Sequence, residues 1–305
     1  MGPFLEVLLG GLLTGVLYSL VALGFVLIFK ASGVFNFAQG AMVLFAALAM
    51  ARLQEWLTPT LGWVAFPVAL ALSAAIMMAL AFAIERLVLR YLINQEGIIL
   101  FMATIGITFF LDGFGQTLWG SDIYEIDLFL PKDPIFLFED MFPGGLLVDP
   151  YELLAAVIAG LLVVVLAVFF QKTRVGRALR AVADDHQAAQ SVGIPLNYIW
   201  LIVWTVAGLV ALVAGMMWGA KLGVQFSLAL VALKALPVLI LGGFTSVPGA
   251  IIGGLIIGAG EKLAEIYVGS MLGGGIENWF AYVLALAFLL FRPQGLFGER
   301  IIERV

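Results

Sequence analysis

The sequence has no cysteine, a single histidine and few charged residues. Its 305 residues include 15 Lys and Arg and 20 Asp and Glu, so that 11% of the chain is charged and the formal net charge is -5. Without cysteine the chain can form neither a disulfide framework nor a thiolate metal site. One histidine cannot by itself build a metal site or a catalytic triad. The acidic balance argues against nucleic acid as a partner.

Recognisable catalytic motifs are absent as well. The sequence contains no H-E-x-x-H zinc motif, no G-x-S-x-G nucleophile elbow and no G-x-x-x-x-G-K-[ST] phosphate-binding loop. We therefore expect a non-catalytic protein with no cofactor bound by this chain. If ATP drives the protein, another chain must bind the nucleotide and its Mg.

Apolar residues, in contrast, make up 63% of the chain. They are gathered into charge-free runs long enough to cross a bilayer, which takes about 20 helical residues. The long runs are Val7–Phe29, Ala31–Ala51, Trp56–Ile84, Leu153–Phe170, Gln187–Ala220 and Ala235–Gly260, and the shorter ones are Gly97–Leu111 and Trp279–Phe291. None of them alternates as a membrane strand would. The sequence predicts an all-α, polytopic membrane protein with about eight spanning or partly spanning helices, forming one domain over residues 1–305.

The charges between the runs orient the chain. The predicted loop 119–152 holds eight acidic residues and the single basic residue Lys132, whereas basic residues crowd the predicted loop 171–196. By the positive-inside rule, 171–196 is cytoplasmic and 119–152 is periplasmic. Alternation from these loops places the N-terminus outside and the C-terminus in the cytoplasm.

The same alternation constrains the C-terminal third. Residues 219–275 must begin and end outside, so the chain crosses inward and back within 228–265. It does so either as two spans or as a re-entrant pair. Glycine and proline in "GGFTSVPG" (242–249) mark the turn.

Several glycines are spaced four residues apart in the apolar runs. The pairs are Gly11 with Gly15, Gly249 with Gly253, and Gly254 with Gly258. Small residues at this spacing let helix backbones approach closely in lipid. We therefore predict close helix packing at these positions.

The stretch "TRVGRALRAVADDHQAAQSVG" (173–193) is polar and helical in pattern. Its apolar residues recur at three- and four-residue steps and predict one apolar helical face, formed by Val175, Leu179, Val182, Ala189 and Val192. Gly193 and Pro195 predict where the helix stops. Two interpretations are open at this point. The helix lies on the membrane surface, or it fits into the groove of a partner protein.

Within this stretch, "QAAQSVG" (187–193) resembles the E-A-A-x-x-x-G signature of ABC importer permeases, with Gln187 standing where that family usually has glutamate. The resemblance implies a coupling helix that docks into a cytoplasmic ATPase subunit. The residues it implicates are Arg177, Arg180, Asp184, Asp185, Gln187, Ala188, Ala189 and Gly193. His186 then lies on or near a docking face and has no catalytic role.

Three more stretches narrow the family. "GVFNFAQGAM" (33–42), "LKALPVLILGGFTSVPGAIIGGLIIG" (233–258) and "FRPQGLFG" (291–298) are similar, in order and spacing, to branched-chain amino acid ABC transporter permeases of the LivH/LivM type, nearer to the LivH-like subunit. The resemblance implies an importer of branched-chain or other hydrophobic amino acids in the inner membrane of a bacterium. Its partners would be a second related permease or a second copy of this chain, two cytoplasmic ABC ATPase subunits and a periplasmic solute-binding protein. The family also includes importers of urea, short-chain amides and aromatic solutes.

Four polar residues in apolar surroundings are candidates for the translocation path: Asn36, Gln39, Asp112 and Lys234. Polar groups at membrane depth are costly unless they are hydrogen-bonded or line a polar path. For Asn36 and Gln39, one interpretation is a broken helix that exposes its backbone to the path. The other is that they lock the bundle by interhelical hydrogen bonds. We expect Glu261 and Lys262 to mark the outer end of a helix, which leaves Asp112 as the better candidate for a buried carboxylate.

Two other functional classes compete with the importer subunit. A proton- or sodium-coupled secondary transporter would need Asp112 or Glu261 to carry the coupling ion. A membrane scaffold or receptor component would transport nothing.

Overall fold

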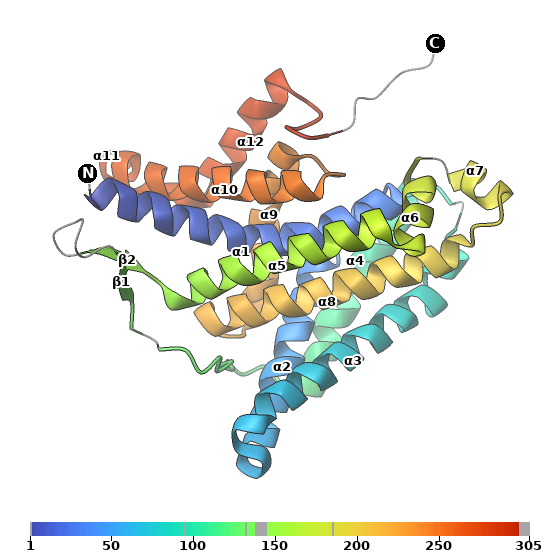
Figure 1. Ribbon diagram of the computed structural model, residues 1–305, viewed down its shortest axis with the longest axis horizontal. Helices are drawn as coiled ribbons and strands as arrows, with labels where there is room; N and C mark the ends of the chain where they lie inside the picture. Colours follow the sequence, from blue (N-terminus) through green and yellow to red (C-terminus); the bar gives the residue numbers. More distant parts are fainter. Residues whose placement is uncertain (1, 94, 132, 138–144, 185, 299–305) are drawn as a thin grey trace.

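The computed structural model describes residues 2–93, 95–131, 133–137, 145–184 and 186–298 and consists almost entirely of helices (Figure 1). In chain order the helices are α1 Gly2–Ser32, α2 Gln39–Leu61, α3 Ala65–Leu87, α4 Gly97–Trp119, α5 Pro150–Lys172, α6 Arg174–Asp184, α7 His186–Ser191, α8 Leu196–Leu222, α9 Val231–Gly242, α10 Val247–Ala264, α11 Ser270–Leu272 and α12 Phe280–Phe291. A short 3-10 segment, η3 (Phe226–Leu230), leads into α9. Two short strands, β1 Ile135–Leu137 and β2 Leu146–Val148, form an antiparallel hairpin.

The helices confirm the prediction of a polytopic membrane protein. Six helical stretches of the described chain are long and apolar enough to cross a membrane, and two shorter apolar stretches, Phe226–Gly242 and Phe280–Phe291, accompany them. One of the six, Gln39–Tyr91, contains α2 and α3, which fold back on each other at Gly62, where φ is 55°. The predicted turn in 242–249 lies between α9 and α10.

Helix α1 lies at the centre of the bundle and packs against α10, α8, α9 and α5. Glycines bring α1 and α10 together, since a Cβ on Gly11 would lie 2.8 Å from the carbonyl oxygen of Gly258, and one on Gly15 would overlap the backbone of Gly254. The hydroxyl of Ser19 lies within hydrogen-bonding distance of the Ala250 carbonyl oxygen, at 3.1 Å. The predicted close packing is thus confirmed, and it occurs between helices of the same chain.

The chain breaks between α1 and α2, inside the run Ala31–Ala51 that was predicted as one span. Gly33 has a φ of 67°, and the side-chain oxygen of Asn36 accepts a hydrogen bond from the backbone N–H of Ala38 at 3.1 Å. A side-chain amide that binds nearby backbone groups competes with helical hydrogen bonds. The helix is therefore broken at Asn36, as one interpretation of the sequence held, but the boundaries of the run were wrong, since α2 starts at Gln39 and ends at Leu61.

The predicted outer loop, 119–152, begins and ends within two residues of the helix boundaries, and it is anchored to the bundle. Tyr124 and Val224 exchange two backbone hydrogen bonds, with N to O distances of 3.0 and 2.7 Å. The side-chain amide of Gln54 donates to the carbonyl oxygen of Asp127 at 2.7 Å. The loop is thus fixed to the ends of α2 and α8.

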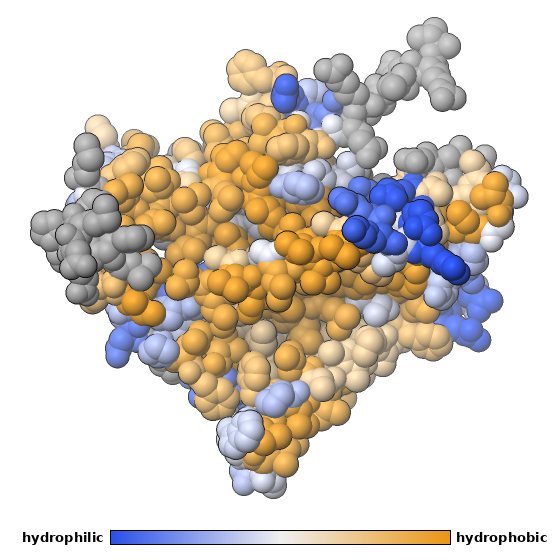
Figure 2. Space-filling view, viewed as in Figure 1, coloured by the Kyte–Doolittle hydropathy of each residue, from blue (hydrophilic) through white to orange (hydrophobic). Residues whose placement is uncertain are grey.

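Apolar side chains cover much of the surface in view, and hydrophilic residues gather at α6 and near other helix ends (Figure 2). The exposed apolar residues on α4 and α5 include Phe109, Phe110, Val157, Leu161 and Val164. This distribution suits lipid around the length of the bundle. It fits the positions of the charge-free runs in the sequence.

Candidate functional site

The polar segment predicted for coupling begins at a sharp junction between α5 and α6. The hydroxyl of Thr173 accepts a hydrogen bond from the N–H of Gly176 at 2.9 Å, which caps the start of α6. The backbone of α6 lies against the end of α5 at Gly176, where a Cβ would lie 2.5 Å from the carbonyl oxygen of Phe169. The junction holds α6 directly on the end of α5.

Helix α6 is amphipathic, as its sequence pattern predicted. Leu179 and Val182 are buried, whereas Arg177 and Arg180 are exposed. The apolar face of α6 packs against α5, α1 and α8. Motion of α6 would therefore act on three helices of the bundle at once.

Helix α7 is separate from α6 and ends in a Schellman motif. The N–H of Gly193 donates to the carbonyl oxygen of Gln190, and that of Ile194 donates to the carbonyl oxygen of Ala189, both at 3.0 Å. Gly193 has a φ of 86°, which confirms the predicted glycine cap. Ala189 is buried and Ala188 is exposed.

The predicted apolar face is only partly correct. Val192 is 76% exposed, because α7 has already ended at Ser191 and the chain turns there. Among the predicted coupling residues, Asp185 lies outside the described residues, as do the side chains of Asp184, His186 and Gln187. The described members Arg177, Arg180, Ala188, Ala189 and Gly193 all belong to this helix pair and its cap.

A cleft that the sequence did not indicate lies beside α7. Its volume is about 550 Å³, and Arg90 and Ile93 line it opposite Gln190, Gly193 and Asn197. Arg90 follows the end of α3, where the orientation predicted from the sequence expects the cytoplasmic side. In the sequence, only the positive charge of Arg90 could have pointed to this cleft. The cleft itself depends on how α3 and α8 pack.

Asn36 and Gln39 are brought together in the break between α1 and α2. Both are completely buried, and the Asn36 amide nitrogen lies 3.5 Å from the Gln39 amide oxygen. The Gln39 amide packs against Gly24 of α1, where a Cβ would overlap it. These contacts favour the interpretation that the two residues lock the bundle.

Lys234 pairs with a carboxylate inside the bundle. Its ammonium nitrogen lies 2.7 Å from the Oε1 atom of Glu261, which also accepts a hydrogen bond from the Tyr18 hydroxyl at 3.3 Å. Glu261 is 1% exposed. Glu261 lies in the last turn of α10, near the expected helix end, but its side chain is enclosed among α1, α9 and α10.

Two more lysines form ion pairs beside this one. Lys221 bonds to Glu152, which also accepts a hydrogen bond from the Thr14 hydroxyl at 2.8 Å, and Lys262 lies 3.1 Å from Glu277. The three lysines line a cavity of about 330 Å³ between α1, α8 and α9, together with Thr14, Tyr18 and Glu277. The cavity thus offers both ammonium and carboxylate groups, which complement the two charges of a free amino acid.

Asp112 does not join this cluster. It lies on α4, whose main packing partner is α2, and its side chain is half-buried. Its Oδ1 atom is buried without a hydrogen-bond partner in the described part of the chain. Asp112, which the sequence favoured as a buried carboxylate, is therefore less enclosed than Glu261.

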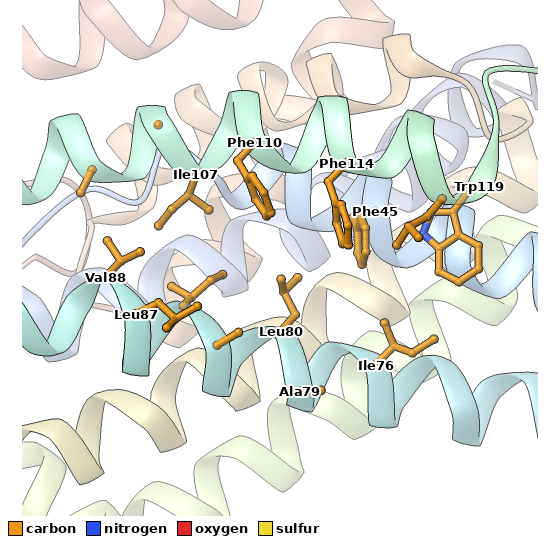
Figure 3. A pocket seen from close by; sticks show the side chains of 15 residues that line it. Phe45, Ile76, Ala79, Leu80, Leu87, Val88, Ile107, Phe110, Phe114 and Trp119 are labelled. Atoms are coloured by element: carbon orange, nitrogen blue, oxygen red, sulfur yellow. The ribbon is translucent and has the colours of Figure 1, made fainter.

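A cavity larger than those at Lys234 and Arg90 has a different chemistry (Figure 3). It occupies about 860 Å³ between α3 and α4, with Phe45 of α2 and Trp119 at one end. Facing side chains such as Leu80, Phe110 and Phe114 line it, and none of its lining residues is charged. It lacks the groups needed to bind an ammonium or a carboxylate, and it suits an apolar occupant such as lipid.

Comparison with known proteins identifies the family. A family model described as "Branched-chain amino acid transport system / permease component" matches residues 7–292. The high-affinity branched-chain amino acid transport system permease protein BraD of Pseudomonas aeruginosa is 29% identical to this chain, with 99% of this chain and 98% of that protein covered. The corresponding permease protein LivH of Escherichia coli is 28% identical, with the same coverage.

One further relative and one solved structure are similar to this chain. The probable branched-chain amino acid transport permease protein LivH of Methanocaldococcus jannaschii is 28% identical, and the match covers 96% of this chain and 92% of that protein. Among solved structures, PsaBC from Streptococcus pneumoniae in complex with Fab aligns with a TM-score of 0.46 at 15% identity, covering 93% of this chain and 90% of that chain. Because the family model spans nearly the whole chain, the protein belongs to the permease components of branched-chain amino acid transport systems, the membrane subunits of ABC importers.

Proposed function

We propose that this chain forms the translocation path for branched-chain or other hydrophobic amino acids, which a periplasmic binding protein delivers. The names of its relatives supply the substrate class. The cavity at Lys234 supports it, because that cavity combines charges of both signs with aromatic and aliphatic side chains. Of the four predicted path residues, we assign Lys234 to the path. Asn36 and Gln39 hold the break between α1 and α2.

The single observation that carries the transport mechanism is the construction of α6 and α7. These helices lie at one end of the bundle (Figure 1), and α6 is fixed there through its contacts with α5, α1 and α8. We assign ATPase docking to these two helices and the cap of α7, where Arg177, Arg180 and Ala188 are exposed and Ala189 is buried. The assigned residues are Arg177, Arg180, Asp184, Asp185, Gln187, Ala188, Ala189 and Gly193, and Arg90 extends the surface across the neighbouring cleft.

The assembly we propose contains a second permease, either related or identical to this one, together with two cytoplasmic ATPase subunits. ATP and Mg bind to those ATPase subunits, and this chain has no catalytic role. The complex lies in the inner membrane, with the N-terminus of this chain periplasmic and the C-terminus cytoplasmic. The positive-inside distribution around 171–196 supports that orientation.

Reconstitution of the complete transporter in proteoliposomes tests both parts of the proposal. Loaded binding protein should stimulate ATP hydrolysis and drive uptake of radiolabelled leucine. Ala188→Trp should abolish the stimulation while the bundle stays folded, because its site lies outside the long helices. Val157→Trp on the exposed side of α5 is the matched control, and we expect it to behave as the wild type.

Three results would contradict the proposal. Uptake of urea, a short-chain amide or an aromatic solute in place of leucine would overturn the substrate. Full stimulation in Ala188→Trp would overturn the docking surface. Uphill uptake by this chain alone in a proton gradient would show a secondary transporter.

A further inference from the structure

A second polar cavity lies at the end of the bundle where α6 begins. It has a volume of about 320 Å³ and is enclosed by α1, α5, α6 and the turn between α9 and α10. Two cationic side chains line it, Lys30 from the end of α1 and Arg180 from α6, together with the hydroxyl-bearing residues Thr245 and Ser246. The cavity therefore gathers positive charge from segments far apart in the sequence.

Neither cation forms an ion pair with any described residue, in contrast to the three lysines of the cavity at Lys234. Lys30 is half-buried and Arg180 is exposed. Helix α10, 18 residues long, begins at the same place, and its positive dipole end adds to the potential. An anion entering the cavity would meet two cations that have no carboxylate partner among the described residues.

The other wall of the cavity is apolar. Val163, Ala167 and Phe170 of α5 line it, and Phe297 closes it from the C-terminal segment. Neighbouring residues on α5, such as Val164, are exposed and face the region we assign to lipid. The cavity thus joins a cationic end at headgroup level to an apolar wall at the level of the acyl chains.

We propose that this cavity binds an anionic phospholipid of the cytoplasmic leaflet, with Lys30 and Arg180 holding its phosphate and one acyl chain lying along Val163 and Ala167. A phospholipid and free inorganic phosphate both carry a phosphate group that the two cations could bind. The apolar wall favours the lipid. Because Arg180 belongs to α6, the bound lipid ties the docking helix to α1 and α10. The proposal depends on the membrane topology and is independent of the transported solute.

Lipid retention by the full chain tests the proposal. The protein is reconstituted in nanodiscs containing phosphatidylglycerol and phosphatidylcholine and is extracted in mild detergent. The lipids that stay bound are then quantified by mass spectrometry. Wild type should be enriched in phosphatidylglycerol, and Lys30→Gln should reduce that enrichment about fivefold, the contribution of one basic residue near an anionic surface.

A matched control separates the cavity from general surface charge. Lys172→Gln removes a cation from the exposed end of α5, outside the cavity, and should retain the lipid as wild type does. Ala167→Phe fills the apolar wall without changing the charge. It should reduce phosphatidylglycerol retention while size-exclusion chromatography shows an intact protein.

Four outcomes would overturn the proposal. Lys30→Gln retains phosphatidylglycerol as the wild type does, or Lys172→Gln loses as much as Lys30→Gln. Inorganic phosphate protects the lipid-free protein against heat although phosphatidylglycerol is not retained, which would indicate a free-phosphate site. Arg180→Gln releases the ATPase subunits with lipid retention unchanged, which would assign Arg180 to protein docking alone.

Discussion

At the scale of single residues, the closest approaches in the bundle occur where glycine leaves room for a neighbouring backbone. Gly15 meets Gly254, and Gly11 meets Gly258, so α1 and α10 touch without intervening side chains. Such contacts gain dispersion energy in lipid, where no water is excluded. A larger side chain at either position must push the helices apart.

We expect Gly15→Leu to destabilise the bundle by at least about 1–3 kcal/mol, the usual cost of overpacking. Fluorescence-detected thermal unfolding in detergent measures the effect. Gly10→Leu is the matched control on the same helix, since no atom lies within 4 Å of a Cβ built there. Equal unfolding temperatures for the two variants would contradict the packing described for α1 and α10.

The ion pair of Lys234 and Glu261 supports a second prediction. Lys234→Met leaves the Glu261 carboxylate buried without its cation, which typically costs about 3–5 kcal/mol. The double variant Lys234→Met with Glu261→Gln removes both charges and should recover much of the thermal stability. Leucine uptake should stay below the wild-type rate in both variants, because both lack the ammonium group that we assign to the path.

That comparison distinguishes a path residue from a structural one. Full recovery of uptake together with stability in the double variant would show that the pair serves only to hold α9 on α10.

Glu261 also illustrates a limit of sequence reasoning. A charge at the edge of an apolar run is compatible with a helix end, and only the packing of α1 against α10 shows that Glu261 is enclosed.

At the scale of elements, the junction of α5 and α6 is the most constrained turn of the polar end. We expect Gly176→Ala to displace α6, because the new Cβ would collide with the backbone of Phe169 and Phe170. Stimulation of ATP hydrolysis by loaded binding protein should fall severalfold. Gly160→Ala on α5 is the control, because the space around Gly160 is open. A normal response in Gly176→Ala would show that α6 is free to shift.

The prediction for the cap of α7 rests on backbone conformation, whereas the prediction for Gly176 rests on a steric collision. No atom lies within 4 Å of a Cβ on Gly193, so a substitution there meets only the cost of its left-handed backbone, about 1–2 kcal/mol. Gly193→Val should weaken co-purification of the ATPase subunits, whereas Gly193→Asn should nearly preserve it, since asparagine tolerates this conformation. Equal loss in both variants would point to a requirement for glycine at the docking surface.

Elements were predicted well where hydropathy alone decides them. The eight apolar segments, the turn in 242–249 and the amphipathic helix near 173–193 all follow from sequence pattern. The start of α2 was missed. It depends on a local hydrogen bond at Asn36, which competes with a helical pattern that would otherwise continue.

At the scale of the whole molecule, the sequence could not predict which helices pack against each other. Nothing in an apolar run states which neighbour it contacts, and the cavities at Lys234 and Arg90 exist only because distant helices meet. Composition predicted the membrane environment, and motif order predicted the family. The charges that meet inside the bundle come from helices far apart in the chain.

The central position of α1 has a consequence for biosynthesis. α1 leaves the ribosome first among the described helices, yet Tyr18 finds Glu261 243 positions later in the chain. At about 5–20 residues per second, translation separates the two by roughly 12–50 s. During that interval the glycine face of α1 lacks its partner α10, although α8, which is synthesised earlier, can already pack against α1. The core is therefore completed late in synthesis, when α9 and α10 pack against an α1 that has already been inserted.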